Sequence, residues 1–308
     1  MKRSQVLAIV MAVCLFMSFA LGSSSSSSSD STKAITGTGA DAGGEKDSGV
    51  ADITTKAKPA TPTIEEAVVY DEGGIKITAK EYTTDSMWGD GIKFLIENDT
   101  DKNIMVGCNA LIVNNYMISD LFATEVAAGK KTNETMTLSS SQLKAAGIDV
   151  IGQIEVYFHI YDHDTYDTIK NTDCILIKTS LYDQMDTKAD DSGEVLYDEG
   201  GIKIIGKYVN DSDFWGAAIL LYVENNSDRN VVIHAENVSI NGFTFDSAIF
   251  SSTVYAGKKA YDDITLFSTE LEENGIKTVE EVSLKFRISD PETYKEIAKS
   301  DEITFKTK

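Results

Sequence analysis

The peptide VVYDEGGIKI at residues 68–77 returns as VLYDEGGIKI at residues 195–204, 127 residues further along the chain. The correspondence continues well beyond this peptide. Later matches follow in the same order: VAAGKK at 126–131 with VYAGKK at 254–259, and DHDTYD at 162–167 with DPETYK at 290–295. An internal match of this extent predicts a tandem duplication of about 115 residues per copy, so each copy can serve as a control for the other.

Within each copy, apolar residues alternate with polar ones or form short runs, which indicates β-strands. The segments are IKITAK (75–80), IKFLIEN (92–98), QIEVYFHI (153–160) and CILIKT (174–179), then IKIIGK (202–207), ILLYVEN (219–225), EVSLKFRI (281–288) and EITFKT (302–307). Turn formers such as Gly73-Gly74, Asn114-Asn115 and Asn241-Gly242 separate strands and predict tight hairpins. SSSQLKAAGI (139–148) and FSTELEENGI (267–276) instead predict one or two helical turns, with a Ser or Thr cap and a closing glycine.

These patterns predict seven or eight short antiparallel strands in each copy. That number of strands, in a segment of this length, is typical of an immunoglobulin-like sandwich. The predicted fold class is therefore all-β: two tandem immunoglobulin-like β-sandwiches at residues 67–180 and 195–308, which follow a signal peptide and a disordered linker.

The N-terminal residues differ in composition from the two copies. Residues 1–22 contain two basic residues, then an apolar stretch, and end in a cleavage signal with small residues at its first and third positions. This pattern predicts a signal peptide and a secreted, extracellular protein. Residues 23–66 are rich in Ser, Gly and Thr and predict a disordered tether, and the acidic residues 181–194 predict an exposed linker. The alternative is membrane attachment through the N-terminal segment, either as an uncleaved helix or through a lipid on Cys14.

Charge and motif content exclude several classes of function. A net charge of −21 over 308 residues repels phosphate backbones, so nucleic acid is not an expected partner. The sequence contains no GxSxG, HExxH, GxxxxGK[ST] or strand-linked GxGxxG motif, and no histidine is shared between the copies. We therefore predict no catalytic residue, no nucleotide or other cofactor, no metal site and no enzymatic activity.

One segment of the first copy contains candidate metal ligands. The aspartates of Asp162–Asp167 lie close in sequence to His159 and His163, and their alternating oxygen ligands resemble the beginning of a calcium loop. The glycine and the later glutamate of an EF-hand are missing, however, and the second copy has Lys295 in place of Asp167. We expect a strand-connecting turn without a tight calcium site. The alternative is a secreted, metal-assisted hydrolase that uses the Asp162–Asp167 region.

Other conspicuous residues have plain structural interpretations. Trp88 and Trp215 occupy matching positions and fit packed core aromatics, with carbohydrate stacking as the alternative. Lys130-Lys131 and Lys258-Lys259 are expected to begin edge strands, with anion binding as the alternative. The sequons at Asn98, Asn133, Asn210, Asn225 and Asn237 are interpreted as incidental in a chain rich in Asn, Ser and Thr.

A disulfide bond between Cys108 and Cys174 is not expected. Cys108 is in phase with the inward residue Val106, whereas Cys174 corresponds to Glu302, an expected surface position of the second copy. The two thiols should therefore point to opposite faces, which the geometry of a disulfide does not allow.

Both copies resemble repeats in secreted proteins and lipoproteins of clostridial bacteria. The resemblance is carried by the YDEGGIKI peptide, the IEN or VEN segment before a polar turn, VxAGKK and the TLSSSQL crossing. Those repeats are similar in turn to immunoglobulin-like, antigen-type extracellular domains of unknown function in Gram-positive bacteria. The resemblance covers residues 68–179 and 195–307 and implies the fold and an extracytoplasmic location. In contrast to many such lipoproteins, this chain has Gly22-Ser23 in place of a cysteine at the end of its leader.

The expected function is that of a secreted or cell-surface protein without catalytic activity, whose two modules serve binding or display at the bacterial envelope. The residues shared by the copies, such as Gly73, Asn98, Gly129 and Leu143, are turn formers and apolar positions, and they include no nucleophile paired with a base. An envelope protein or polysaccharide is the expected partner. Binding is expected on loops and edge strands where the copies differ.

Overall fold

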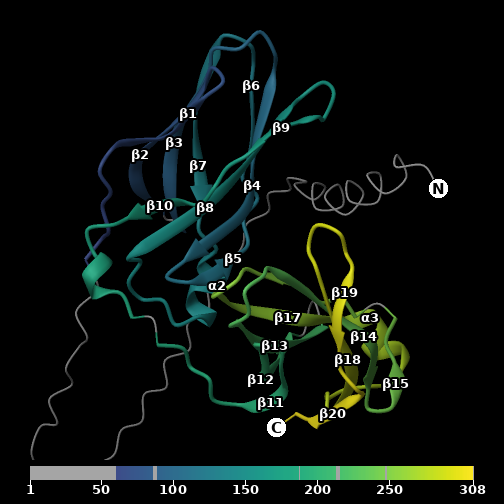
Figure 1. Cartoon of the computed structure of the whole chain (residues 1–308). Helices are drawn as coiled ribbons and strands as arrows, with labels where there is room; N and C mark the ends of the chain where they lie inside the picture. Colours follow the sequence, from purple (N-terminus) through teal and green to yellow (C-terminus); the bar gives the residue numbers. More distant parts are fainter. Residues whose placement is uncertain (1–59, 86–88, 187, 213–215, 247, 308) are drawn as a thin grey trace, which may run out of the picture. The chain divides into compact units, whose positions relative to one another are not determined.

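The computed structural model describes residues 60–85, 89–186, 188–212, 216–246 and 248–307. The predicted signal peptide with Cys14, most of the tether, Trp88 and Trp215, and the side chain of Asn210 lie outside these residues. The described part is almost entirely β-structure, which confirms the all-β class (Figure 1). No helix within it has the length and apolar character needed to cross a membrane.

Residues 67–180, the first of the two copies predicted from the sequence and called the first repeat below, form two layers. One sheet has the order β1-β2-β3-β7, with β1 (Ala67–Glu72), β2 (Ile75–Asp85), β3 (Gly89–Asn98) and β7 (Lys130–Thr137). The facing strands have the order β10-β8-β4-β5, with β4 (Ile104–Val113), β5 (Tyr116–Ile118), β8 (Gln153–Asp162) and β10 (Ile175–Lys178). β6 (Ala123–Val126) pairs with β4, and β9 (Thr168–Asn171) pairs with β8.

The second repeat (195–308) has its corresponding strands in the same chain order. β11 (Glu194–Glu199), β12 (Ile202–Ser212), β13 (Gly216–Asn225) and β17 (Lys259–Phe267) are neighbours in that order. The opposite sheet contains β14 (Val231–Ile240), β15 (Phe243–Thr244), β16 (Ser251–Val254), β18 (Glu281–Ser289), β19 (Glu296–Lys299) and β20 (Ile303–Lys306). The prediction of seven or eight strands per copy was wrong, because very short strands such as β5 and β15 leave no alternating pattern in the sequence.

The expected turn chemistry is present. Asn114 and Asn115 have φ of 48° and 71°, and Asn241 and Gly242 have φ of 51° and 85°. Two successive positive φ angles are those of a type I′ hairpin turn, which matches the twist of the flanking strands. The Asn-Asn and Asn-Gly pairs therefore set the β4–β5 and β14–β15 hairpins, as predicted.

Two short helices lie at the predicted crossings. α2 spans Ser140–Ala145 and is followed by Gly147, whose φ is 66°. The Ile148 amide donates to the Leu143 carbonyl at 2.8 Å. This is the hydrogen bond of a Schellman ending, which glycine favours. α3 (Ser268–Glu273) ends in the same way at Gly275. The N-cap residue of α2 is a serine, Ser139, as predicted, but it forms no side-chain capping hydrogen bond. The N-cap residue of α3 is Phe267, so the predicted Ser or Thr cap was wrong there.

Aromatic residues fill the centre of the first repeat. Phe94 of β3 lies edge-on to Phe158 of β8 at a ring separation of 5.3 Å, and Phe122 completes the group. Phe94 and Phe158 are fully buried. The matching place in the second repeat contains Phe286 and Phe250. Inward residues of β3 and β8 therefore meet between the layers, as the period of two predicts.

The two repeats share a sheet. β5 of the first repeat pairs in parallel with β17 of the second, and the Lys259 amide donates to the Asn115 carbonyl at 3.0 Å. β17 is therefore an interior strand, whereas the described residues place no strand on the outer side of its counterpart β7. Strand pairing joins the two repeats, in addition to the connecting chain.

The segment 181–194 is mostly exposed and is anchored at both ends. Leu181 is buried ahead of a single 3-10 turn at Tyr182–Gln184. Further on, the Asp190 carbonyl accepts hydrogen bonds from the Tyr261 hydroxyl and the Lys207 ammonium, at 2.9 and 2.7 Å. The contacts with Tyr261 and Lys207 fix the end of the segment to strands of the second repeat.

Candidate functional site

The junction between the repeats contains a buried ion pair. The Lys258 ammonium, just before β17, donates to both carboxylate oxygens of Glu155 in β8, at 2.6 and 2.8 Å. It also donates to the Asn115 side chain at 3.2 Å, and Gln153 donates to the Glu155 carboxylate at 3.2 Å. The side chains of Lys258 and Glu155 are only 16% and 9% exposed. These contacts join second-repeat Lys258 to a polar group built entirely from the first repeat.

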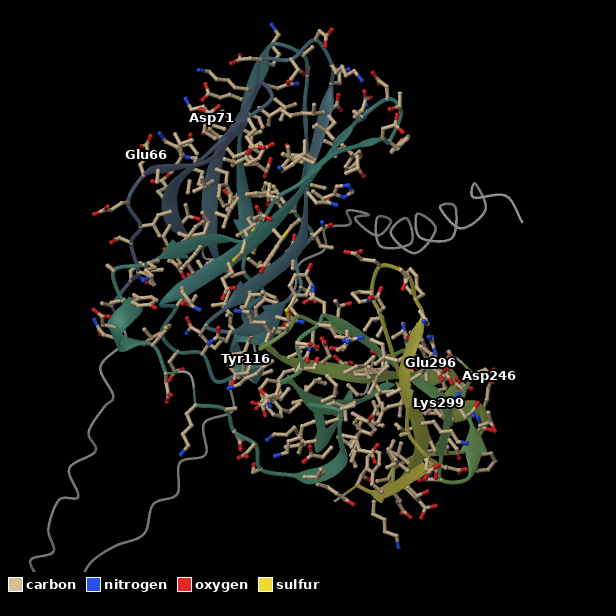
Figure 2. All side chains as sticks on the ribbon, viewed as in Figure 1. Glu66, Asp71, Tyr116, Asp246, Glu296 and Lys299 are labelled. Atoms are coloured by element: carbon tan, nitrogen blue, oxygen red, sulfur yellow. The ribbon has the colours of Figure 1, made fainter. Side chains whose placement is uncertain are left out.

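An aromatic cluster lies beside this ion pair. Tyr116 of β5 stacks on Tyr261 of β17 at a ring separation of 5.9 Å, and Tyr222 of β13 lies 5.2 Å from Tyr261. Tyr222, Tyr261 and Ile205 belong to the same buried cluster as the first-repeat core. Tyr116 lies where strands of the two repeats meet (Figure 2). Apolar packing and strand pairing therefore act together at the junction.

At the junction, the residues of one repeat differ in chemical type from their counterparts in the other. Tyr261 and Leu220, which pack against the first repeat, correspond to Asn133 and Lys93 in the first repeat. Glu155 corresponds to Ser283. The expectation that both lysine pairs begin edge strands was therefore wrong for Lys258, which is a partner in the junction. Several positions that differ between the copies are therefore residues of the junction.

A second feature recurs in both repeats, at the β8–β9 and β18–β19 hairpins. Asp162 accepts backbone hydrogen bonds from Asp164 and Thr165 at 3.0 and 3.1 Å, and its counterpart Asp290 accepts bonds from Glu292 and Thr293 at 3.1 and 2.8 Å. Each aspartate thus closes an Asx-type turn. The prediction of a strand-connecting turn in both repeats is confirmed.

The Asp162 carboxylate is fully engaged in this turn. Its second oxygen accepts a 2.8 Å hydrogen bond from the Lys102 ammonium, and its side chain is 6% exposed. The Lys102 ammonium and the backbone donors hold the pKa of Asp162 down, at about 2. Asp162 therefore stays ionised at neutral pH, and its oxygens serve to shape the hairpin.

The candidate metal ligands do not converge. His163 contacts Glu125 and Asp164 at 3.5 and 3.3 Å, whereas His159 contacts Thr168 at 3.2 Å. Burial lowers the pKa of His159. Across residues 60–307, excluding the undescribed positions, no group of three or more His, Cys, Asp or Glu side chains is arranged to hold a metal ion.

Calorimetric titration with calcium is expected to give no micromolar isotherm. Binding through Asp162 would require the ion to displace Lys102 and two backbone donors from a carboxylate whose oxygens are already satisfied. The Asp164→Ala variant is the control and should give the same trace as the wild type. A micromolar isotherm that disappears in Asp164→Ala would contradict this prediction.

Each hairpin also exposes a tyrosine and an isoleucine. Tyr166 and Tyr294 are 53% and 66% exposed, and Ile169 and Ile297 are 43% and 41% exposed. The β8–β9 and β18–β19 hairpins are drawn in Figure 1, and Figure 2 labels Glu296 on the second of them. The same pair of exposed side chains therefore occurs twice, in the same local structure.

The tyrosines adopt an unfavourable backbone conformation. Their φ angles are 62° and 57°, in the left-handed region that glycine and asparagine tolerate best. A tyrosine there destabilises the turn by about 1 to 2 kcal/mol. The Tyr166 ring stacks on Tyr161 at a ring separation of 6.2 Å, whereas the second repeat has Ser289 at the position of Tyr161. The backbone therefore gives no reason for tyrosine at Tyr166 and Tyr294.

Sequence reasoning located the hairpins but missed these side chains. The available signal was that Tyr166 and Ile169 recur as Tyr294 and Ile297, the tyrosine in a polar turn and the isoleucine on the short strand that follows it. The expectation that binding residues lie where the copies differ overlooks this pair.

The structure also places the cysteines, three of the sequon residues and Lys131. Cys108 and Cys174 are both free, as predicted, with Cys108 partly buried and Cys174 exposed. The sequon residues Asn98 and Asn225 are fully buried, whereas Asn133 is exposed on β7. Lys131, near the beginning of β7, has its ammonium nitrogen 4.0 Å from a carboxylate oxygen of Glu97.

Comparisons with known proteins leave the function open. The chain matches no protein-family model, and no curated protein matches its sequence. Among solved structures it is similar to a protein of unknown function from Porphyromonas gingivalis W83, with 8% identity and a TM-score of 0.24, over 76% of this chain and 98% of that one. It is also similar to the Salmonella enterica SafA pilin in complex with the SafB chaperone, with 10% identity and a TM-score of 0.24, over 77% and 98%. TM-scores this low support no inference about function.

Proposed function

We propose that this chain is a secreted or cell-surface protein without catalytic activity, which binds a component of the bacterial envelope through its two exposed hairpins. The observation that carries the proposal is the repeated pair of exposed side chains, Tyr166 with Ile169 and Tyr294 with Ile297. Exposed aromatic and aliphatic groups on loops are common at binding surfaces. The envelope location is an expectation from the N-terminal sequence and from the resemblance to clostridial repeats.

The junction supports a bivalent mode of binding. Strand pairing and the Lys258–Glu155 ion pair join the repeats, so that both hairpins belong to one connected unit. When two weak contacts are linked, the second forms at a high effective concentration and raises the overall affinity without a deep pocket. A protein or polysaccharide with repeated epitopes fits such an arrangement.

The Tyr166→Asn/Tyr294→Asn variant is expected to remain folded and to lose binding to purified Gram-positive cell walls. Asparagine tolerates the left-handed conformation, so the thermal midpoint should stay the same or rise. Loss of one tyrosine alone should weaken apparent affinity about 100-fold through lost avidity. Co-sedimentation with intact walls, with protein-stripped walls as a second arm, measures this effect and separates polysaccharide from protein partners.

The control is Leu121→Asn, which removes a side chain that is 99% exposed outside both hairpins. It should bind as the wild type does. Binding that survives the double variant, or no binding in either arm, would contradict the proposal. Hydrolysis of esters, peptides or glycans that disappears in Asp164→Ala would instead support the hydrolase alternative.

A further inference from the structure

A side-chain amide lies beside the buried lysine of the junction. The Lys258 ammonium donates to the side-chain oxygen of Asn115 at 3.2 Å and to the Glu155 carboxylate at 2.6 and 2.8 Å. The Gln153 amide donates to the same Asn115 oxygen at 3.3 Å and to Glu155 at 3.2 Å. An amine, the carbonyl of an amide, a carboxylate and a second hydrogen-bond donor therefore meet in one small group.

The duplication shows that the fold does not require this group. At the positions of Asn115, Gln153 and Glu155, the second repeat has Gly242, Glu281 and Ser283. The β14–β15 hairpin keeps two successive positive φ angles with glycine at the second turn position. The turn therefore gives no reason for a side chain at Asn115, and the set of four groups occurs only where the repeats meet.

The site is largely shielded from water. Lys258 and Glu155 are mostly buried, and Gln153 is buried. Tyr157, on the same face of β8 as Glu155, lies edge-on to Tyr255 of the second repeat at a ring separation of 5.1 Å. Burial disfavours charged forms, so transfer of a proton from the ammonium to the carboxylate, which neutralises both groups, is less costly here than in water. The neutral amine that results is a nucleophile.

We propose that Lys258 and Asn115 become joined by an amide bond, with Glu155 as the proton carrier and Gln153 as the donor to the carbonyl oxygen. Glu155 accepts a proton from Lys258 Nζ, and the lone pair of Nζ forms a bond to Asn115 Cγ. The carbonyl electrons move onto Oδ1, where the Gln153 amide stabilises the negative charge. When the carbonyl forms again, the bond between Cγ and Nδ2 breaks and its electron pair leaves with Nδ2.

The reaction needs no oxidant and no further reactant. Nζ gives up two protons, which Glu155 carries in turn to Nδ2, so that Nδ2 leaves as one ammonium ion. Glu155 returns to a carboxylate, and Lys258 and Asn115 share a neutral amide. The hydrogen bond that already holds the amine against the amide supplies the proximity that such a step requires. The reaction takes place once in each chain, links positions 143 residues apart and is independent of any ligand that the repeats bind.

Mass spectrometry of the full chain, folded and then denatured, tests for the bond. The wild type is expected to be lighter than its sequence by one ammonia molecule, and a protease digest should contain a branched peptide that joins Asn115 to Lys258. The branched peptide is the decisive observation, because succinimide formation at Asn241-Gly242 also releases ammonia. Chain kept in denaturant throughout is the control and should contain no branched peptide. Recovery of Asn115 and Lys258 only in separate peptides from the folded wild type would overturn the proposal.

Two variants separate the reaction from the ion pair. Asn115→Gly copies the turn of the second repeat, so it should fold and keep the contact between Lys258 and Glu155, but it should contain no branched peptide through Lys258. Glu155→Gln keeps the shape of the proton carrier and should lose the branched peptide as well. A branched peptide through Lys258 in Asn115→Gly, or one at the yield of the wild type in Glu155→Gln, would contradict the assigned roles.

Discussion

Replacement of Glu155 by alanine is expected to lower the free energy of unfolding by about 3 to 5 kcal/mol. The two carboxylate oxygens each accept a hydrogen bond from the Lys258 ammonium. Removal of the carboxylate leaves this ammonium, on a side chain that is 16% exposed, without its counter-ion. A buried charge that loses its partner is strongly destabilising, even where the intact pair adds little net stability. Urea unfolding followed by circular dichroism measures the change.

The second repeat offers the matched control for this substitution. Ser283 occupies the position of Glu155 on β18 and hydrogen-bonds with Thr304, without a charged partner. Ser283→Ala should therefore change stability by about 1 kcal/mol or less. Equal effects of Glu155→Ala and Ser283→Ala would show that the Lys258 contact does not stabilise the fold.

Replacement of Asn98 by alanine is expected to lower the free energy of unfolding by about 3 kcal/mol or more. Its amide donates to the Lys102 and Val126 carbonyls at 2.8 and 2.9 Å, and its oxygen accepts from the Thr100 amide at 3.0 Å. Asn98 is fully buried, so alanine removes these hydrogen bonds from the Val126 carbonyl and the Thr100 amide, while the Lys102 carbonyl keeps the Thr100 hydroxyl as a donor. Each such group destabilises by about 1 to 3 kcal/mol.

Asn225 repeats this arrangement, with donation to the Arg229 and Val254 carbonyls at 2.9 and 2.8 Å. Asn225→Ala should therefore destabilise by a similar amount. Asn133→Ala, at an exposed sequon residue on β7, should have an effect within about 0.5 kcal/mol. Thermal unfolding of the three variants compares them, and a small effect at Asn98 or Asn225 would contradict the assigned role.

Local features of the fold were predictable because they depend on a few adjacent residues. The period of two placed β3 and β8, and the Asn-Asn and Asn-Gly pairs placed their hairpins. The buried Asn98 was expected only as a turn former. Its contact with Val126, 28 residues later in the chain, depends on tertiary packing that no local pattern contains.

The junction was not predictable from one copy. The alternation of apolar and polar residues along β17 and β8 assigns Tyr261 and Glu155 to the outward faces of their sheets, which is correct within each repeat. The same pattern does not indicate which residues of the other repeat cover those faces. Comparison of the copies did contain a signal, since Asn133 and Lys93 become Tyr261 and Leu220. A change from polar to apolar on an outward face indicates a contact, which the structure supplies through β5 and β17.

Thiol protection in urea shows whether the junction joins both repeats into one cooperative unit. Two variants each carry a single cysteine, with every other cysteine replaced by serine. The first retains Cys108, and the second carries Ala235→Cys at the matching position of the second repeat. We expect one urea midpoint for both thiols, and two separate midpoints once Glu155→Lys breaks the junction. Two separate midpoints in the chains that retain Glu155 would contradict it.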